Sequence, residues 1–250
     1  MERPQVLRLA LLKVTTLVFL ASLFLPTSSL ADSQPAPRPF SANYELELAG
    51  IKAGEIRLTL DQLGDGRYRY RRTSHTTGLV DLLRSRSIDE YSELEIINGE
   101  LRPVHYFYLK QGRDTRRVSI DFDWESMTAT NHVNDSRWTM AIPKGTWDKL
   151  SVELAVVLDL QVTGELGEYP VADGGQLKQY QFEQLGTEWV ATDAGRFETL
   201  VIKRHREADS KRSTILWMAP TLHYVAAKVR HENKGEGEGE ATLTSFQQQD

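Results

Sequence analysis

The chain has 250 residues, of which 40% are hydrophobic and 26% are charged, and it contains no cysteine. This composition is typical of a globular protein and excludes collagen-like, coiled-coil and wholly disordered chains. The absence of cysteine excludes structural disulfides, thiolate metal sites, a cysteine nucleophile and a lipidated cysteine. A formal net charge of −5 argues against a general nucleic-acid-binding protein, because such proteins usually carry a basic surface.

The N-terminus has the three-part pattern of a secretory signal peptide. Basic residues come first, and an uncharged apolar run follows at 14–25. Ser29 and Ala31 then place small residues at positions −3 and −1 of a cleavage site before Asp32. The alternative is a membrane anchor, but the apolar run is shorter than the roughly 20 residues that a spanning helix needs. We therefore predict a cleaved signal peptide at 1–31 and a periplasmic protein without a transmembrane segment.

The rest of the chain divides into a short leader and one long region. Residues 32–39 are rich in proline and predict a flexible leader. Residues 40–250 contain no linker-like stretch that would separate two cores. We therefore predict a single β-rich domain over 40–250.

Apolar and polar residues alternate with a period of two along most of this region. The alternation is strict from Phe40 to Leu48 and returns at Ile56–Leu60. Such a pattern indicates strands with one buried face. Turn signals at Gly64–Gly66 and Asn98–Gly99 separate neighbouring strands into hairpins.

The whole pattern predicts roughly 12 to 14 strands at the spacing typical of an antiparallel sandwich or barrel. It includes separate strands at Gln179–Gln184 and Glu188–Thr192, on either side of Gly186. The chain lacks the repeated crossover helices that parallel sheets require.

One segment, 147–160, breaks the alternation and reads WDKLSVELAVVLDL. Leucine and valine recur in it at helical spacing, and neither glycine nor proline interrupts it. We predict one amphipathic helix, Asp148–Leu160, whose apolar stripe packs on the sheet. Asp148 or Ser151 is expected to cap the helix by accepting free backbone N–H groups, and the alternative is a catalytic role for this pair.

Four sequence features occur in order along the chain. They are Phe40-x-Ala42-x-Tyr44 with Gly50 and Gly54, Asp148-x-Leu150-Ser151, Gly186-x-Glu188 followed by Thr192-x-Ala194-Gly195-Arg196-Phe197, and Ile215-x-Trp217 with Pro220. Together they resemble DUF3108, a bacterial family of secreted all-β proteins of unknown function, over nearly all of the mature chain.

The resemblance implies a fold but no chemistry, because the family brings no catalytic residues to carry over. Its layout is similar to the open half-barrel of periplasmic lipoprotein carriers, in which a helix packs on the concave side of a curved sheet. This likeness concerns the fold alone, which does not determine function. The predicted fold is therefore mainly β, a curved antiparallel sheet or open half-barrel with one packed amphipathic helix.

Motifs for catalysis or metal binding do not stand out. None of the six histidines forms an HExxH motif or a close pair, and the chain has no Gly-x-Ser-x-Gly elbow. Nothing in the sequence singles out a pair of carboxylates for glycoside hydrolysis. We predict no enzymatic activity, no metal and no cofactor, with a hydrolase of dispersed site residues as one alternative.

Two groups of residues are candidates for ligand binding. Apolar residues at 79–83 interrupt two polar strands and form either a lid over a cavity or a plug on the core. Tyrosines on strands that share the sheet would face a ligand if the half-barrel is incompletely filled. The candidate residues are Leu79, Val80, Leu82, Leu83, Tyr68, Tyr70, Tyr106 and Tyr108.

Arginines at positions 67, 69 and 71 share one strand face. We interpret them as a solvated outer face, and the alternative is contact with acidic lipid headgroups or a phosphate.

The function predicted from these observations is an envelope binding protein for an apolar ligand such as a lipid or an acyl chain. A scaffold that holds another protein through a sheet edge or an aromatic face is the alternative.

Overall fold

The computed structural model describes residues 36–78, 86–205, 212–233 and 237–249. The chain divides into two units, Met1–Ala31 and Asp32–Asp250, and only the second contains described residues. The predicted signal peptide therefore lies outside the described residues. In the part of the chain that the structure describes, no helix is long and apolar enough to cross a membrane.

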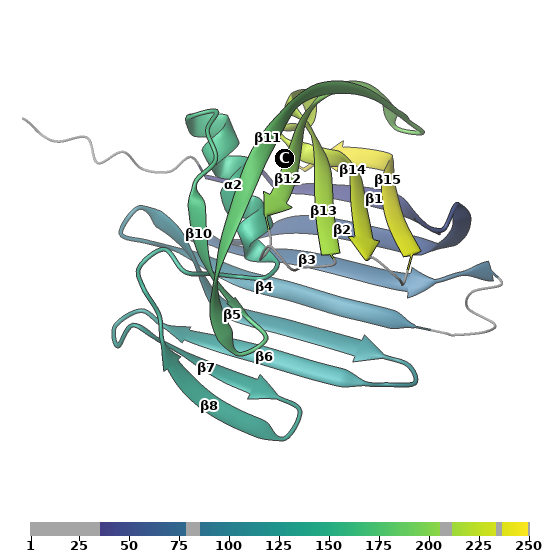
Figure 1. Cartoon of the computed structure of the whole chain (residues 1–250). Coiled ribbons are helices and arrows are strands. Elements are labelled where there is room, and N and C mark those ends of the chain that lie inside the picture. Colours follow the sequence, from purple (N-terminus) through teal and green to yellow (C-terminus); the bar gives the residue numbers. More distant parts are fainter. Residues whose placement is uncertain (1–35, 79–85, 206–211, 234–236, 250) are drawn as a thin grey trace, which may run out of the picture. The chain divides into compact units, whose positions relative to one another are not determined.

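Fifteen strands form one sheet in the described part of the chain (Figure 1). The first eight are β1 Phe40–Leu48, β2 Ile51–Gly64, β3 Arg67–Thr76, β4 Ser87–Ile97, β5 Glu100–Gln111, β6 Arg116–Asp123, β7 Thr128–Val133 and β8 Ser136–Ala141. The other seven are β9 Trp147–Asp148, β10 Glu168–Asp173, β11 Gln176–Thr192, β12 Gly195–His205, β13 Arg212–Ala219, β14 Val225–Asn233 and β15 Gly237–Gln248. Helix α2 spans Ser151–Val162, and a short 3-10 helix, η1, spans Pro220–Leu222.

The strand order shows two meanders that meet at a seam. Strands β1 to β8 follow one another along one arm of the sheet, and β15 back to β9 follow one another along the other. Strand β1 pairs with both β2 and β15, so it joins the two arms. Within the described residues every pairing is antiparallel except the two-residue pair of β9 with β10. The predicted mainly-β class and curved antiparallel sheet are thus confirmed.

A side chain links edge strand β8 to the turn between β10 and β11, near the other end of the sheet. The indole Nε1–H of Trp138, in edge strand β8, donates a hydrogen bond of 3.1 Å to the carbonyl oxygen of Gly175. Gly175 lies in the turn between β10 and β11 and has a φ of +80°. A Cβ atom at this position would collide with the Trp138 ring, so the close approach requires glycine.

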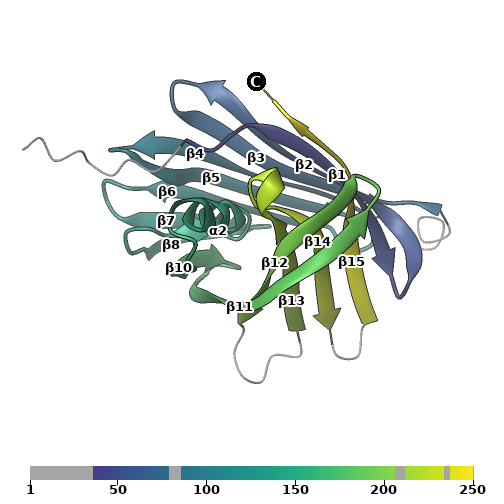
Figure 2. The same ribbon diagram turned by 90° about the horizontal axis from the view of Figure 1, so that it is seen from above.

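Helix α2 lies on the concave side of the sheet, between the two arms (Figures 1 and 2). Leu154 and Leu158, from the predicted apolar stripe, are buried. Val152 and Val156, on another face of the helix, are buried as well. Because the sheet curves around the helix, more than one of its faces is covered.

The helix begins three residues later than predicted, at Ser151 instead of Asp148, and it ends at Val162 instead of Leu160. Trp147 and Asp148 form β9 instead, which pairs with β10. Because the backbone of β9 is extended, the helical spacing in the sequence overestimates the length of the helix at its N-terminal end.

Asp148 accepts backbone N–H groups at the helix start, as expected, although the N-cap position itself is Leu150, which makes no side-chain capping bond. Asp148 Oδ1 accepts the backbone N–H groups of Leu150 and Ser151 at 2.9 and 2.8 Å. Ser151 Oγ in turn accepts the backbone N–H of Asp148 at 3.1 Å. These reciprocal bonds resemble a capping box and satisfy donors that would otherwise be unpaired in the buried helix start.

Strand β11 runs without a break from Gln176 to Thr192, so the prediction of two separate strands is wrong. A register shift between Gln184 and Gly186 forms a bulge, and pairing with β12 continues on both sides of it. Leu185 is half exposed in this bulge, and Gly186 has a φ of +123°. The glycine therefore marks a bulge within one strand, where it supplies a backbone conformation that other residues rarely adopt.

Candidate functional site

A cavity of about 1040 Å³ lies on the concave side of the sheet, next to α2. Strands β1 to β6 of one arm and β10 to β15 of the other contribute to its lining, together with α2. Its volume is at the upper end of the roughly 300–1,000 Å³ that small-molecule sites usually occupy. The curvature of the sheet creates the concave space, and α2 occupies only part of it.

Apolar side chains form much of the cavity wall, and several keep accessible surface there. Ile56, Val157, Leu216 and Val229 line the cavity and are only half-buried. Removing such surface from water is favourable by about 25 cal/mol per Å², so it provides a binding surface for an apolar ligand. Other apolar lining residues are Phe40, Tyr44, Leu58, Leu60, Leu154, Leu158, Met218, Val225 and Phe246.

The structure brings three of the four predicted tyrosines to this cavity. Tyr70, Tyr106 and Tyr108 line it, from β3 and β5. Tyr68 is buried on the same face of β3 but does not line the cavity. The predicted apolar segment, with Leu79, Val80, Leu82 and Leu83, lies outside the described residues.

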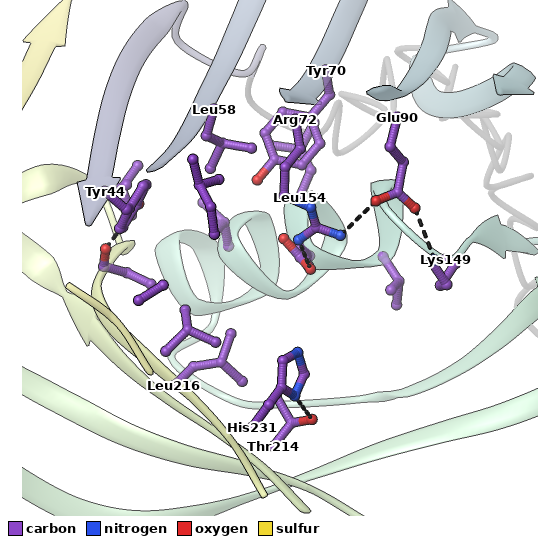
Figure 3. A pocket seen from close by; sticks show the side chains of 18 of the residues that line it. Tyr44, Leu58, Tyr70, Arg72, Glu90, Lys149, Leu154, Thr214, Leu216 and His231 are labelled. Atoms are coloured by element: carbon purple, nitrogen blue, oxygen red, sulfur yellow. Dashed lines mark hydrogen bonds and ion pairs between the residues drawn. The ribbon is translucent and has the colours of Figure 1, made fainter. Parts of the chain in front are cut away.

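A group of charged side chains lies at the cavity wall between the sheet and the start of α2 (Figure 3). Arg72 donates from Nη2 to Glu90 Oε2 at 2.8 Å and from Nη1 to Glu153 Oε1 at 2.9 Å. Lys149 Nζ lies 3.1 Å from Glu90 Oε1, which also accepts the hydroxyl of Tyr106 at 2.6 Å. Glu90 is only 2% exposed, so these contacts compensate a charge that water does not reach.

The electrostatics of Glu90 follow from these partners. Burial by itself would raise the pKa of its carboxyl group, but the cations Arg72 and Lys149 outweigh that effect and lower the pKa to about 2. Burial by itself would lower the pKa of Arg72, but the carboxylates of Glu153 and Glu90 hold it well above its ordinary value. Both groups are therefore charged at neutral pH and form a stable polar wall.

A second polar group lies across the cavity, on the other arm of the sheet. Arg204 of β12 pairs in register with Thr214 of β13, and Thr214 pairs with His231 of β14. All three side chains line the cavity. Thr214 Oγ1 and His231 Nδ1 are 2.8 Å apart, as drawn in Figure 3. We call Arg204, Thr214 and His231 the polar row.

His231 is neutral at physiological pH. Loss of bulk water around the ring and the nearby cations Arg72 and Arg204 lower its pKa from 6.5 to about 4. The shift indicates positive electrostatic potential at this end of the cavity.

The arginines at 67, 69 and 71 lie on the opposite face of β3. Arg69 and Arg71 form cross-strand ion pairs with Glu93 and Asp89 at 2.6 and 2.8 Å, outside the cavity. This arrangement agrees with a solvated outer face.

Sequence reasoning missed the charged residues of the cavity. The signal was present for Arg72, because it alternates in phase with Tyr68 and Tyr70 and so belongs to the inner face of β3. Arg204 and His231 likewise alternate in phase with Ile202 and Val229, but the sequence does not show that their strands pair so that the two residues flank Thr214.

The pair Asp148 and Ser151 has a structural role. Besides capping α2, Asp148 accepts the hydroxyl groups of Ser92 and Ser151, each at 2.7 Å. All three residues are fully buried, and no described histidine bonds to them. In the described ranges, moreover, no three His, Asp or Glu side chains are grouped as a metal site would require.

A solved structure shares this fold at low sequence identity. A β-barrel-like protein of the DUF1849 domain of unknown function from Brucella abortus matches with a TM-score of 0.57 and 10% identity, over 85% of this chain and 98% of that chain. A candidate lipoprotein from Parabacteroides distasonis matches with a TM-score of 0.33 and 11% identity, over 85% of this chain and 97% of that chain. The second score is too low to support an argument, and the first concerns the fold alone.

A comparison with curated proteins finds no match. The sequence profile of a protein family described as "Protein of unknown function (DUF3108)" matches residues 43–244. The match covers most of the chain and nearly all of the sheet, from β1 to β15. The chain therefore belongs to the DUF3108 family.

Proposed function

We propose that this protein is a non-enzymatic binding protein of the bacterial envelope that holds a lipid or another ligand with an acyl chain in the cavity. The observation that supports the proposal is a cavity of about 1040 Å³ with accessible apolar side chains from both arms of the sheet. Each CH₂ group that moves from water into such a site contributes about 0.8 kcal/mol, so an acyl chain provides ample binding energy.

The N-terminal sequence supports a location in the periplasm. Residues 1–31 have the order of basic, apolar and small residues that directs a chain across the inner membrane. A carrier in this compartment would shield an apolar ligand from water.

The chemistry of the cavity favours binding over catalysis. Glu90 is held ionised by two cations, with a pKa of about 2, so it is a poor proton donor at neutral pH. Asp148 and Ser151 are occupied in the helix cap. These carboxylates are engaged in structural contacts.

Fluorescence of N-phenyl-1-naphthylamine, a neutral apolar probe, tests the proposal. The probe should bind the wild-type protein in the cavity and be displaced by a fatty acid. Ala241→Trp, which places a large ring in the cavity, should weaken binding at least about tenfold.

Thr242→Trp is the matched control, because Thr242 is the next residue of β15 and does not line the cavity. It should leave the affinity unchanged. Absence of probe binding to the wild-type protein, or equal loss in both variants, would count against a cavity ligand. Native mass spectrometry of freshly purified protein should in addition show a bound mass that organic solvent removes.

One observation favours a second candidate, a scaffold for another protein. Trp189 of β11 is 57% exposed, and the guanidinium of Arg196 lies 4.9 Å from its ring centroid. Strand β12 pairs with β13 only from Leu200 to Arg204, so the outer part of the β11–β12 hairpin has a free edge in the described sheet (Figure 2). Exposed Trp and Arg side chains are enriched at protein interfaces.

Photo-crosslinking in cells tests this candidate. A crosslinker at position 189 should capture one defined protein partner, and a crosslinker at the exposed position 57 of β2 should not. Equal capture at both positions would exclude a specific interface at the hairpin.

A further inference from the structure

We propose that the ligand is an anionic amphiphile and that the polar row, Arg204, Thr214 and His231, binds its carboxylate or phosphate headgroup. This inference rests on the proposed function and specifies the chemistry of the ligand for the same cavity. It follows from three observations: the charge of the cavity wall, the absence of a described acceptor for the Nε–H of Arg204, and the order of polar and apolar positions along three strands.

The cavity wall is cationic, although the chain as a whole has a net charge of −5. Among the described residues, seven lysine and arginine side chains line it, against four carboxylates. The cations are Arg38, Arg72, Lys110, Arg116, Lys149, Arg204 and Arg212, and the carboxylates are Glu90, Glu153, Asp173 and Glu238.

These carboxylates already have cationic partners. Glu90 and Glu153 bind Arg72, and Lys149 also contacts Glu90. Asp173 contacts Lys178 at 2.8 Å, and Glu238 contacts Arg230 at 2.7 Å. The acids of the cavity are therefore not available to compensate the cation of the polar row.

Arg204 lacks an anionic partner in the described part of the chain. No described carboxylate lies within the 4.0 Å of an ion pair, and the guanidinium carbon lies 4.5 Å from the ring centroid of Tyr180. Its Nε is buried and has no hydrogen-bond partner among the described residues. A buried N–H of a charged group without an acceptor is costly, and a carboxylate or phosphate oxygen is the acceptor that a guanidinium binds best.

The neighbouring residues of the row suit the same anion. Thr214 and neutral His231 share one hydrogen bond of 2.8 Å, so the pair can offer one donor to an anion's oxygen, either the hydroxyl of Thr214 or the ring N–H of His231. Another carboxylate at this place would instead repel the anion. Besides the loss of bulk water, the cations Arg72, Arg204 and Lys149 lower the pKa of His231. Their combined field at this point of the cavity favours a negative charge.

Along each of the three strands, an apolar position lies two residues away from the polar one. Ile202 lies two residues before Arg204 in β12, and Val229 lies two residues before His231 in β14. Leu216 lies two residues after Thr214 in β13, which runs in the opposite direction. The register aligns Ile202 with Leu216 and Leu216 with Val229. The polar row therefore borders an apolar row about 6.6–6.8 Å away. Leu216 and Val229 of the apolar row line the cavity, whereas Ile202 is fully buried. The order matches the boundary between the headgroup and the chain of an amphiphile.

Binding of cis-parinaric acid and of its methyl ester tests the proposal, because the two probes share one chain and differ in the charge of the headgroup. The wild-type protein should bind the acid at least about tenfold more tightly than the ester. Arg204→Gln should remove this preference by weakening binding of the acid, with little effect on the ester. Arg57→Gln, which removes a cation from the exposed face of β2, should preserve the preference.

Arg204→Lys provides a second variant that keeps the charge but not the planar fork, so it should retain part of the preference for the acid. Thermal melting of each variant establishes that it is folded under the conditions of the assay. If Arg204→Gln does not fold, loss of part of the preference in Arg204→Lys supports the proposal, and an unchanged preference contradicts it.

The outcomes separate this inference from the proposed function. Equal binding of acid and ester by the wild-type protein would overturn the headgroup site and leave the apolar cavity ligand standing. Failure of both probes and of N-phenyl-1-naphthylamine to bind would overturn both proposals. Displacement of the acid by inorganic phosphate as effectively as by lysophosphatidic acid would show a site for free anions and overturn the amphiphile.

Discussion

Strand β3 carries adjacent arginines on its two faces, and their surroundings differ sharply. On the outer face, Arg71 pairs with Asp89 of β4 at 2.8 Å, and the two side chains are 45% and 36% exposed. On the inner face, Arg72 pairs with Glu90 of β4 at the same distance, but Glu90 is only 2% exposed. The two strands and the kinds of charge are alike, but the inner carboxylate is buried and has Lys149 and Tyr106 as further partners.

The two faces of the sheet place similar ion pairs in different surroundings. The outer pair lies in water, where such contacts contribute about 0–1 kcal/mol and mainly keep the surface soluble. In the inner pair Glu90 has been taken out of water, whereas Arg72 is 29% exposed, so loss of Arg72 would leave a poorly compensated carboxylate inside the protein. The inner face thereby obtains fixed charges beside an apolar cavity, as recognition of an amphiphile requires.

Removal of one carboxylate from each pair should give the largest contrast. Glu90→Gln should destabilise the protein by about 3 kcal/mol, because Arg72 and Lys149 lose the charge that compensates them. Asp89→Asn, the neighbouring outer-face change, should cost less than about 1 kcal/mol. Urea unfolding measures both values, and similar losses for the two variants would contradict the contrast.

The same contrast should appear for apolar residues of α2. Leu154 is 3% exposed, and its truncation to alanine should cost about 2 kcal/mol, the lower end of the range for buried leucine. The value is at the lower end because Leu154 borders a cavity, so the new void joins existing space. Val162, 54% exposed at the end of the helix, should lose less than about 0.5 kcal/mol on the same truncation. A loss that small for Leu154 would show that the inner face of the helix does not support the fold.

The division between inner and outer faces could be predicted from the sequence, because period-two alternation assigns each residue of a strand to a face. It correctly placed arginines 67, 69 and 71 on one face of β3, and it predicted the mainly-β fold. The start of α2 and the continuous β11 could not be read in this way. Asp148 belongs to a two-residue strand formed by tertiary pairing, and Gly186 stands in a bulge whose sequence resembles a turn.

The candidate site was less predictable than the fold. Tyrosines at the cavity followed from their positions on strands, but the polar row requires three strands to pair in one particular register. Alternation within a strand does not contain that register. The size of the cavity depends in turn on how far the sheet curves and how much of the space α2 fills, which are properties of packing.

A pH titration of stability should distinguish the inner face further. The pKa of His231 is about 4 in the folded protein and 6.5 ordinarily, so the unfolded chain binds more protons between these values. Stability from this group is therefore complete above about pH 6.5 and is lost as the pH falls towards about 4. His231→Gln should remove about 1 kcal/mol of the change in the free energy of unfolding between pH 6.5 and pH 4. This value is smaller than the full pKa shift implies, because water in the cavity screens the ring.

Glu90 acts in a different pH range, because its pKa is about 2 in the folded protein against 4.5 ordinarily. Its stabilisation is lost as the pH falls from about 4.5 towards 2, so the two groups can be separated in one titration. If the free energy of unfolding of His231→Gln changes with pH between 4 and 6.5 as much as that of the wild type, the native state does not disfavour the charged imidazole.

The smallest expected effect is the response of the outer pair to salt. Arg71→Gln should cost at most about 0.5 kcal/mol in dilute buffer, because its ion pair with Asp89 is accessible to water. At 1 M salt the Debye length is about 3 Å, so this cost should vanish. Arg72→Gln, next along the strand, leaves Glu153 and the buried Glu90, only 2% exposed, without their shared cation. Mobile ions screen a buried carboxylate much less than an exposed one. The cost of Arg72→Gln should therefore persist at 1 M salt, as urea unfolding at both salt concentrations would measure. If salt abolished the cost of Arg72→Gln as well, water and ions would reach the inner charges freely, and the cavity would be too wet to favour an amphiphile over a simple anion.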